Sequence, residues 1–203
     1  LIAENYFKPE EEKPADALCE DTSKRESNVK QFLMSDGSYT MAVYAQNIHY
    51  KDESGEWQDI DNTLSESGSE FSNANARVKF SKKIPGNEGI FTIHENNRKI
   101  TVSLERAKKK TVGTVTNKTT EHGENATQLQ KMTTLDKLNA SILYADILEN
   151  TDIEYVLNGS DIKENIIVKA KGESYSYTFT LQLNNLTARL DGNEVLLCDG
   201  DEH

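Results

Sequence analysis

The stretch Tyr175-Ser-Tyr-Thr-Phe-Thr-Leu-Gln-Leu183 alternates apolar and polar side chains along its whole length. In an extended chain, neighbouring side chains point to opposite faces, so all the apolar residues of this stretch share one face. They are Tyr175, Tyr177, Phe179, Leu181 and Leu183. The pattern predicts a strand that buries one face and exposes the other, and the apolar face requires a second layer of structure to cover it.

Shorter runs of the same kind recur along the chain. They cover residues 78–80, 90–94, 99–104, 141–144, 153–157, 162–169 and 195–198. Turn-forming pairs such as Asn96-Asn97 and Asn158-Gly159 separate them. This organisation predicts an all-β fold, an antiparallel β-sandwich with long irregular loops. At most a short helix is expected, within residues 126–138.

Two further strand features precede these runs. Residues 39–44, Tyr-Thr-Met-Ala-Val-Tyr, all suit a strand, and the run predicts a strand covered on both faces. Residues 49–51 and 57–60 flank the turn sequence Asp-Glu-Ser-Gly-Glu. They predict a hairpin with Gly55 at its tight position.

Composition suggests how the chain is divided. Residues 1–26 are rich in acids and contain Pro9 and Pro14, so we expect an acidic, flexible linker or pro-region there. Residues 27–203 are expected to form the sandwich module. Within it, residues 105–139 hold seven Lys and Arg against four Asp and Glu. We expect a long polar loop there, with a basic patch for an anionic partner as the alternative.

The 203-residue chain has a net charge of −11. Such a charge repels phosphate backbones and argues against a nucleic-acid partner. No apolar run is long enough for a membrane span. The chain starts Leu1-Ile-Ala-Glu, without a basic and apolar leader, so any signal peptide is expected to lie outside it.

Two acidic positions are candidate sites. Asp59 and Asp61 share a strand face after the hairpin and could hold calcium, but a polar strand edge is the alternative that we favour. Glu164 falls on the same strand face as Ile162 and Ile166. An acid there needs a structural hydrogen bond or ion pair with a lysine or arginine, or an edge position, and these outweigh a catalytic role; a bulge that turns Glu164 outward is also open.

Other reactive residues are scattered. Cys19 and Cys198 lack metal spacing and are expected to be free thiols, with a bridge between them as the alternative. The histidines are far apart in sequence, which predicts no zinc site; they are His49, His94, His122 and His203. The sequence therefore predicts no catalytic residue, no metal ligand, no cofactor-binding residue and no cofactor. Trp57 could stack on a sugar, although core packing is the expectation.

Two long stretches carry a family resemblance. Residues 27–44 with 48–64, which include His-Tyr-Lys-Asp-Glu-Ser-Gly-Glu-Trp-Gln-Asp-Ile, form the first. Residues 144–157, with Ile-Lys-Glu-Asn-Ile-Ile-Val at 162–168 and Tyr-Thr-Phe-Thr-Leu at 177–181, form the second. Together they resemble the N-terminal β-rich region of the wall-associated protein A-like family, secreted bacterial proteins that carry DNRLRE domains and rearrangement-hotspot (YD) repeats.

The resemblance implies a bacterial, extracellular or cell-surface protein of the polymorphic-toxin type. It implies that any toxin or nuclease activity lies in a C-terminal region absent from this chain. We therefore expect a non-catalytic scaffold or docking module and no enzyme. The alternatives are a carbohydrate-binding module for cell-wall glycan and, less favoured, a carboxylate-dependent hydrolase built around Asp59, Asp61 or Glu164. The expected partners are downstream repeat domains of the same polypeptide and cell-wall polysaccharide.

Overall fold

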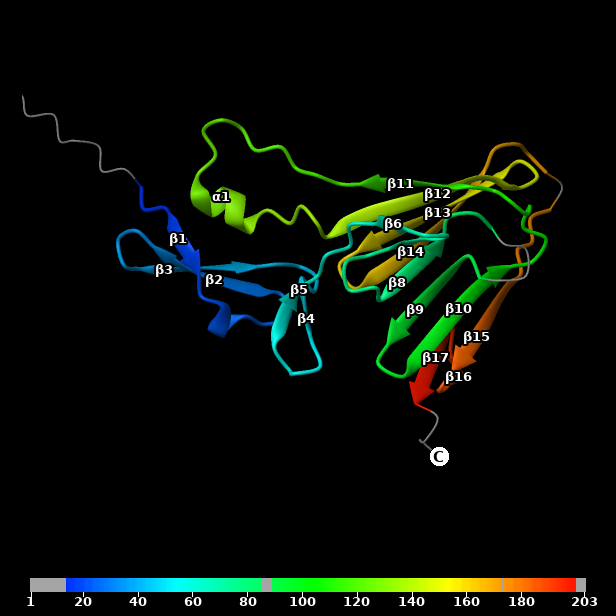
Figure 1. Cartoon of the computed structure of the whole chain (residues 1–203), viewed down its shortest axis with the longest axis horizontal. Helices are drawn as coiled ribbons and strands as arrows, with labels where there is room; N and C mark the ends of the chain where they lie inside the picture. The colour runs from blue at the N-terminus through cyan, green and yellow to red at the C-terminus, as the bar shows by residue number, and fades with distance from the viewer. Residues whose placement is uncertain (1–13, 85–88, 173, 200–203) are drawn as a thin grey trace, which may run out of the picture.

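The fold is built from antiparallel strands, and its two largest sheets pack face to face. The computed structural model describes residues 14–84, 89–172 and 174–199. Figure 1 shows this sandwich at one end of the molecule and a smaller sheet with a helix at the other. The expected all-β antiparallel sandwich with a short helix is confirmed. Neither described helix has the length and apolar character that crossing a membrane would require.

The four-stranded sheet has the order β11-β12-β13-β14. Its strands span Gly113–Asn117, Asn139–Leu148, Thr151–Asn158 and Asp161–Val168. β13 shows which face is buried, because every second residue from Thr151 to Leu157 is buried while the residues between them are half-exposed. The sequence alternation thus turns one face of this sheet toward the second layer.

The six-stranded sheet has the order β15-β10-β9-β8-β7-β6. In chain order its strands are β6 (Ser65–Ser67), β7 (Glu70–Ser72), β8 (Val78–Ser81), β9 (Phe91–Glu95), β10 (Arg98–Leu104) and β15 (Phe179–Asn184). The first five follow one another as a meander, whereas β15 returns from the other sheet to pair with β10. The chain therefore passes between the two sheets more than once.

Aromatic side chains from both sheets meet in the core. The ring of Tyr155 on β13 lies 4.8 Å from Phe91 and 5.7 Å from Phe80, centroid to centroid. Both phenylalanines belong to the six-stranded sheet, so these contacts join the layers, each adding about 0.5–1.5 kcal/mol beyond area burial. The hydroxyl of Tyr144 donates to the carbonyl of Ser81 at 2.7 Å, which gives its buried polar tip a partner across the sandwich.

The smaller sheet has the order β1-β2-β3 and one covered face. Its strands span Ala17–Glu20, Val29–Met34 and Tyr39–Val43, with a short 3₁₀ helix at Thr22–Lys24. Helix α1 (Gln128–Thr133) supplies the cover, packing Leu129 and Met132 near Phe32. A capping box at Thr127 starts the helix, and the Asp16 carboxylate accepts from two of its first N–H groups.

Two hairpins complete the fold. β4 (His49–Lys51) pairs with β5 (Trp57–Asp59) around Gly55, whose φ is +86°, so the predicted hairpin is confirmed. The turn at Asn158-Gly159 is also confirmed, with Gly159 at φ +60°. β16 (Leu186–Asp191) pairs with β17 (Glu194–Asp199) in a separate two-stranded sheet. Residues 195–198 are thus a strand, but in a hairpin beside the sandwich and not within its sheets.

Two strand predictions need correction. Residues 39–44 were expected to be covered on both faces, but Tyr39, Met41 and Val43 are more than half exposed. The physical reason is that α1 covers only the opposite face of the sheet, next to Phe32. The strand expected from residue 175 begins at Phe179, because residues 174–178 lie in an irregular connection.

Inside the expected loop at 105–139 lie β11 and α1, so that segment is partly ordered. The division of the chain at residue 26 stays a prediction. Residues 1–13 lie outside the described part, while residues 14–26 contribute β1 and the 3₁₀ helix.

Asn62 joins the β4–β5 hairpin to the sandwich. Its side chain is buried, and its amide nitrogen donates to the carbonyls of Leu138 at 2.9 Å and Gly159 at 2.7 Å. Its backbone N–H donates to the carbonyl of Lys137 at 2.7 Å. Asn62 therefore donates to three backbone carbonyls, two just before β12 and one in the turn between β13 and β14.

We predict that Asn62→Ala lowers the free energy of unfolding by about 1–3 kcal/mol, because it removes the amide that donates to the buried carbonyl of Gly159, while the carbonyl of Leu138 keeps the N–H of Gly159 as a donor. Denaturant unfolding monitored by circular dichroism measures the change. Asn125→Ala removes an amide from an exposed position and serves as the control, with a change within about 0.5 kcal/mol. Equal stability of the two variants would show that the Asn62 amide does not hold the junction.

Candidate functional site

Charged side chains gather where β2, β4 and β5 meet. Arg25 donates through Nε to Glu20 Oε1 at 2.6 Å and through a terminal nitrogen to Asp59 Oδ2 at 3.1 Å. Lys30 Nζ lies 2.8 Å from Asp59 Oδ1. His49 completes the cluster, with Nδ1 2.6 Å from the carbonyl oxygen of Glu26 and Nε2 3.4 Å from Asp59 Oδ1. Glu20, Arg25, Lys30, His49 and Asp59 are called the junction cluster below.

The junction cluster lowers the pKa of two of its members, His49 and Asp59. The His49 side chain is fully buried, and this burial lowers its pKa, with Arg25 and Lys30 acting in the same direction. Burial alone would raise the pKa of Asp59, but Lys30 and Arg25 outweigh it and hold that pKa below its usual value. Because the His49 imidazole is enclosed, a substrate cannot reach it in this conformation. We therefore interpret the junction cluster as a structural network.

The structure does not bring Asp59 and Asp61, the two acids of the calcium hypothesis, together around one cation position. Asp59 belongs to the junction cluster, whereas Asp61 accepts from the backbone N–H of Thr63 at 3.0 Å and lies 3.1 Å from Lys137 Nζ. A hollow of about 480 Å³ lies beside both acids, and Lys30 and Lys137 also line it. Basic groups therefore occupy the oxygens that a cation would need, and the described residues contain no group of three or more possible metal-binding side chains.

Trp57 and Glu164 have simple surroundings. Trp57 is half-buried on β5, and Lys51 Nζ lies 5.0 Å from its ring centroid in a cation–π contact. Glu164 is exposed on β14, an edge strand that pairs with β13 without a register shift. The edge position, one of the arrangements considered, is observed. Partial burial raises the pKa of Glu164, and the hydroxyl of Tyr155, its partner across the ladder, opposes that shift.

The cysteines and the remaining histidines stay apart. Cys19 and Cys198 are free thiols, as expected. His94 lies on β9, and His122 Nε2 is 3.9 Å from Asp136. His203 falls outside the described residues.

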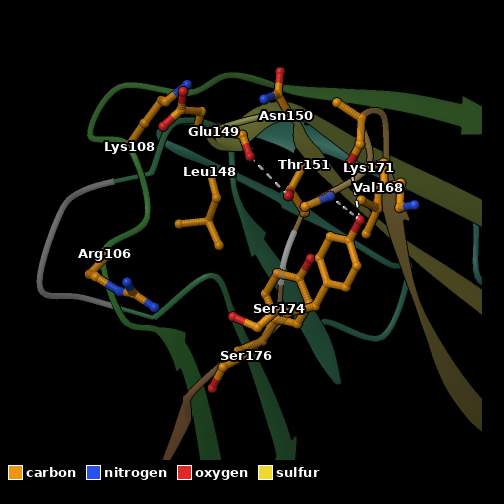
Figure 2. Close-up of a pocket in the computed structure, with 14 residues that line it drawn as sticks. Arg106, Lys108, Leu148, Glu149, Asn150, Thr151, Val168, Lys171, Ser174 and Ser176 are labelled. Atoms are coloured by element: carbon orange, nitrogen blue, oxygen red, sulfur yellow. Dashed lines mark hydrogen bonds between the residues drawn. The ribbon is translucent and has the colours of Figure 1, made fainter.

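A second hollow of about 480 Å³ opens at the end of the sandwich where the chain crosses between sheets. One wall is the β10–β11 connection at residues 105–112, another is the β14–β15 connection at 169–178, and the third is the β12–β13 turn. Figure 2 shows Arg106 and Lys108 on one side of Leu148, with Lys171 and Val168 on the other. This hollow is called the crossover pocket below.

Backbone contacts fix the walls of the crossover pocket. The N–H of Lys108 donates to the carbonyl of Ile147 at 2.7 Å, which ties the first connection to β12. The Tyr175 hydroxyl accepts from the N–H of Gly172 at 2.5 Å and donates to the carbonyl of Ala170 at 3.2 Å, which closes the second connection on itself. Thr151 at the turn is buried, and its hydroxyl donates to the carbonyl of Glu149 at 3.1 Å (Figure 2).

Basic side chains are prominent in the crossover pocket. Among the residues that the structure describes, its lining includes the cations Arg106, Lys108 and Lys171 and the carboxylate Glu149. Sequence reasoning noted the basic excess at residues 105–139 but missed the pocket, because Lys171 joins only through the tertiary fold. The run Arg106 to Lys110 was the available signal.

These features define a class: an antiparallel β-sandwich with an accessory N-terminal sheet and a cation-lined pocket at its crossovers. Comparison with known proteins then finds relatives named WapA. The chain is 31% identical over 169 residues to the tRNA nuclease WapA of Bacillus subtilis strain 168. It is 33% identical over 170 residues to the tRNA3(Ser)-specific nuclease WapA of Bacillus spizizenii, and 32% identical to the tRNA(Glu)-specific nuclease WapA of B. subtilis subsp. natto.

These matches cover 79–80% of this chain but only 6–7% of each relative, so the chain spans less than a tenth of their length. WapA denotes a wall-associated protein, so the expected resemblance is confirmed at that level and points to association with the cell surface. No family model matches the chain. No solved structure matches it either.

The comparison corrects the functional expectation. We expected a non-catalytic scaffold or docking module and no enzyme, yet the relatives that match most of the chain are named as tRNA nucleases. Their names give no support to the alternatives, a carbohydrate-binding module or a carboxylate hydrolase. The residues behind that expectation are turn, strand and core residues, which report architecture and do not report the reaction of the protein that contains them.

The junction cluster makes stability depend on pH. His49 is held neutral when folded, while in the unfolded chain it takes up a proton at its ordinary pKa of about 6.5. The contribution of neutral His49 to the free energy of unfolding is therefore complete above the unfolded-state pKa of about 6.5 and is lost as the pH falls below it. We predict that the free energy of unfolding drops between about pH 7.5 and about pH 5.5, and that His49→Gln flattens this slope. Denaturant titrations at each pH measure it, and an unchanged slope in the variant would assign the dependence to other groups.

Proposed function

We propose that this chain is a segment of a wall-associated nuclease that acts on tRNA. The observation that supports this is its similarity to three tRNA nucleases, at 31–33% identity over about four fifths of its length. The activity is proposed for the whole protein, because the chain corresponds to less than a tenth of each relative.

The same proposal includes the larger organisation. The whole protein is secreted, acts outside the cell, and carries DNRLRE domains and YD repeats beyond this segment. Residues 27–203 form the module together with β1 and the 3₁₀ helix, and its partners are the downstream repeats and cell-wall polysaccharide. The resemblance of residues 27–64 and 144–181 to this family, in the expected order, supports the assignment.

The charge of the segment bears on how tRNA would be held. At −11, its surface as a whole repels a polyanion of the size of tRNA, so the main tRNA contacts are proposed to lie elsewhere in the protein. The segment itself is proposed to have no nucleic-acid partner.

We predict that the full-length protein, purified from its complete reading frame, cleaves tRNA. Total tRNA is incubated with the protein and resolved on a denaturing gel, and probes for individual tRNAs identify the substrate. The expected result is loss of one or a few tRNAs, with 5S ribosomal RNA of similar length left intact as the matched control. Complete survival of every tRNA, or equal loss of both RNA classes, would contradict the proposal.

A further inference from the structure

Strand β3 is an edge of the small sheet, and among the described strands it pairs with β2 alone. The ladder shows which of its backbone groups this pairing uses. The N–H of Tyr44, directly after β3, donates to the carbonyl of Asn28 at 2.9 Å. Bonded residues alternate along an antiparallel ladder, so counting back from Tyr44 the residues of β3 that bond to β2 are Ala42 and Thr40.

The other three residues of β3 direct their backbone groups to the open edge. They are Tyr39, Met41 and Val43, and each presents one N–H and one carbonyl there. Their side chains share one face of the sheet, opposite to the face covered by α1, and all three are more than half exposed. The edge of β3 is therefore unpaired within the described residues and is also apolar.

β3 lacks the features that normally protect an edge strand from pairing. It pairs with β2 without a register shift, and residues 37–48 contain no Asp, Glu, Lys, Arg or Pro. Two other edges differ. β1, at the opposite side of the same sheet, is irregular between Ala17 and Cys19, and β14 carries the charged residues Asp161 and Lys163. Among these edges, β3 is the one that remains open to a further strand.

Antiparallel pairing with β3 of a second copy uses the free groups in one register. If Met41 lies opposite Met41 of the second copy, then Tyr39 lies opposite Val43 of that copy, and Val43 opposite its Tyr39. Each of these pairs exchanges both N–H···O bonds, so every backbone group at the edge finds a partner. An aromatic residue opposite a β-branched one is also a favourable cross-strand pair. β3 is thus complementary to itself about Met41.

We propose that this chain forms a two-fold symmetric dimer through β3 of each copy. The two small sheets become one continuous sheet, with a helix α1 from each copy on the same face. The irregular edge of β1 opposes further strand addition, so the assembly closes at two copies. The strands of the small sheet run along the length of the molecule (Figure 1), so antiparallel pairing places the two sandwiches at opposite ends.

The test is sedimentation velocity of the full 203-residue chain at concentrations up to about 1 mM and at several salt concentrations. We expect a monomer–dimer equilibrium that dissociates on dilution, because pairing one short strand buries a small area. Dimerisation should tighten as salt is raised, because each copy has a net charge of −11. A chain that stays monomeric throughout, or that grows beyond the dimer, would overturn the proposal.

Charge variants at the two-fold axis locate the contact. Met41→Lys places two ammonium groups opposite each other, and Met41→Glu places two carboxylates there, so each variant is expected to weaken dimerisation at least about tenfold. A mixture of the two variants should associate more tightly than either alone, because opposite charges then meet. Leu190→Lys changes an exposed leucine on β16 and is the matched control, with unchanged dimerisation. Melting curves establish that each variant is folded. Dimerisation of Met41→Lys at the strength of the control, or no gain on mixing, would contradict the proposed register.

Amide hydrogen exchange resolves the strand residue by residue. At low protein concentration the amides of Thr40 and Ala42 are expected to be protected by β2, whereas those of Tyr39, Met41 and Val43 exchange freely. Raising the concentration should protect the second group and leave the first unchanged, an alternation that face-to-face packing of two sheets would not produce. Protection of the second group already at the lowest concentration would show that the edge is covered within one chain, and dimerisation without any such protection would place the contact elsewhere. Either result would overturn the proposal.

Discussion

The closure of one sheet over the other around Tyr155 is the constraint from which the rest of the structure follows. Its ring contacts Phe80 and Phe91 of the facing sheet, and it is flanked on its own sheet by Tyr144. Bringing these rings out of water is worth about 25 cal/mol for each Å² of apolar area, so the cluster favours one separation and one register of the layers. The Tyr144 hydroxyl bonded to Ser81 then fixes that register, since a shift would leave it unpaired in the core.

Closing the sandwich also creates its most distinctive surface. The chain leaves the six-stranded sheet after β10 and leaves the four-stranded sheet after β14, and both connections leave at the same end. Connections that cross between layers cannot continue the ladders, so their side chains are free of strand alternation. Arg106 and Lys171 can therefore face one cavity although each belongs to a different crossing. The pocket is a consequence of topology and not of any local motif.

Period-two alternation made the architecture predictable and also limited what could be predicted. It located β13 and β14 and assigned Ile162 and Ile166 to the core side, where they pack. It overextended the strand at Tyr175, because alternation reports which side chains could share a face and not whether a backbone ladder exists. Tyr175 instead uses its hydroxyl to close a loop. Similarly, Tyr39 and Met41 suited a strand, but no pattern in β3 itself could reveal that it would be an edge.

The sequence was misleading about Asp59 and about the cations of the crossover pocket for a related reason. Asp59 looked like a metal ligand because sequence shows acids near one another, while Arg25 and Lys30, which neutralise it, come from other elements. The cations of the crossover pocket looked like a solvated run because Lys171 lies more than sixty residues away from Arg106 and Lys108 in sequence, and only the fold brings all three to the lining of one pocket. Charge counted along a chain describes long-range repulsion, whereas binding depends on the few charges that the fold gathers within a Debye length. A strongly acidic chain can therefore bring several cations to the lining of one cavity, and the fold decides where.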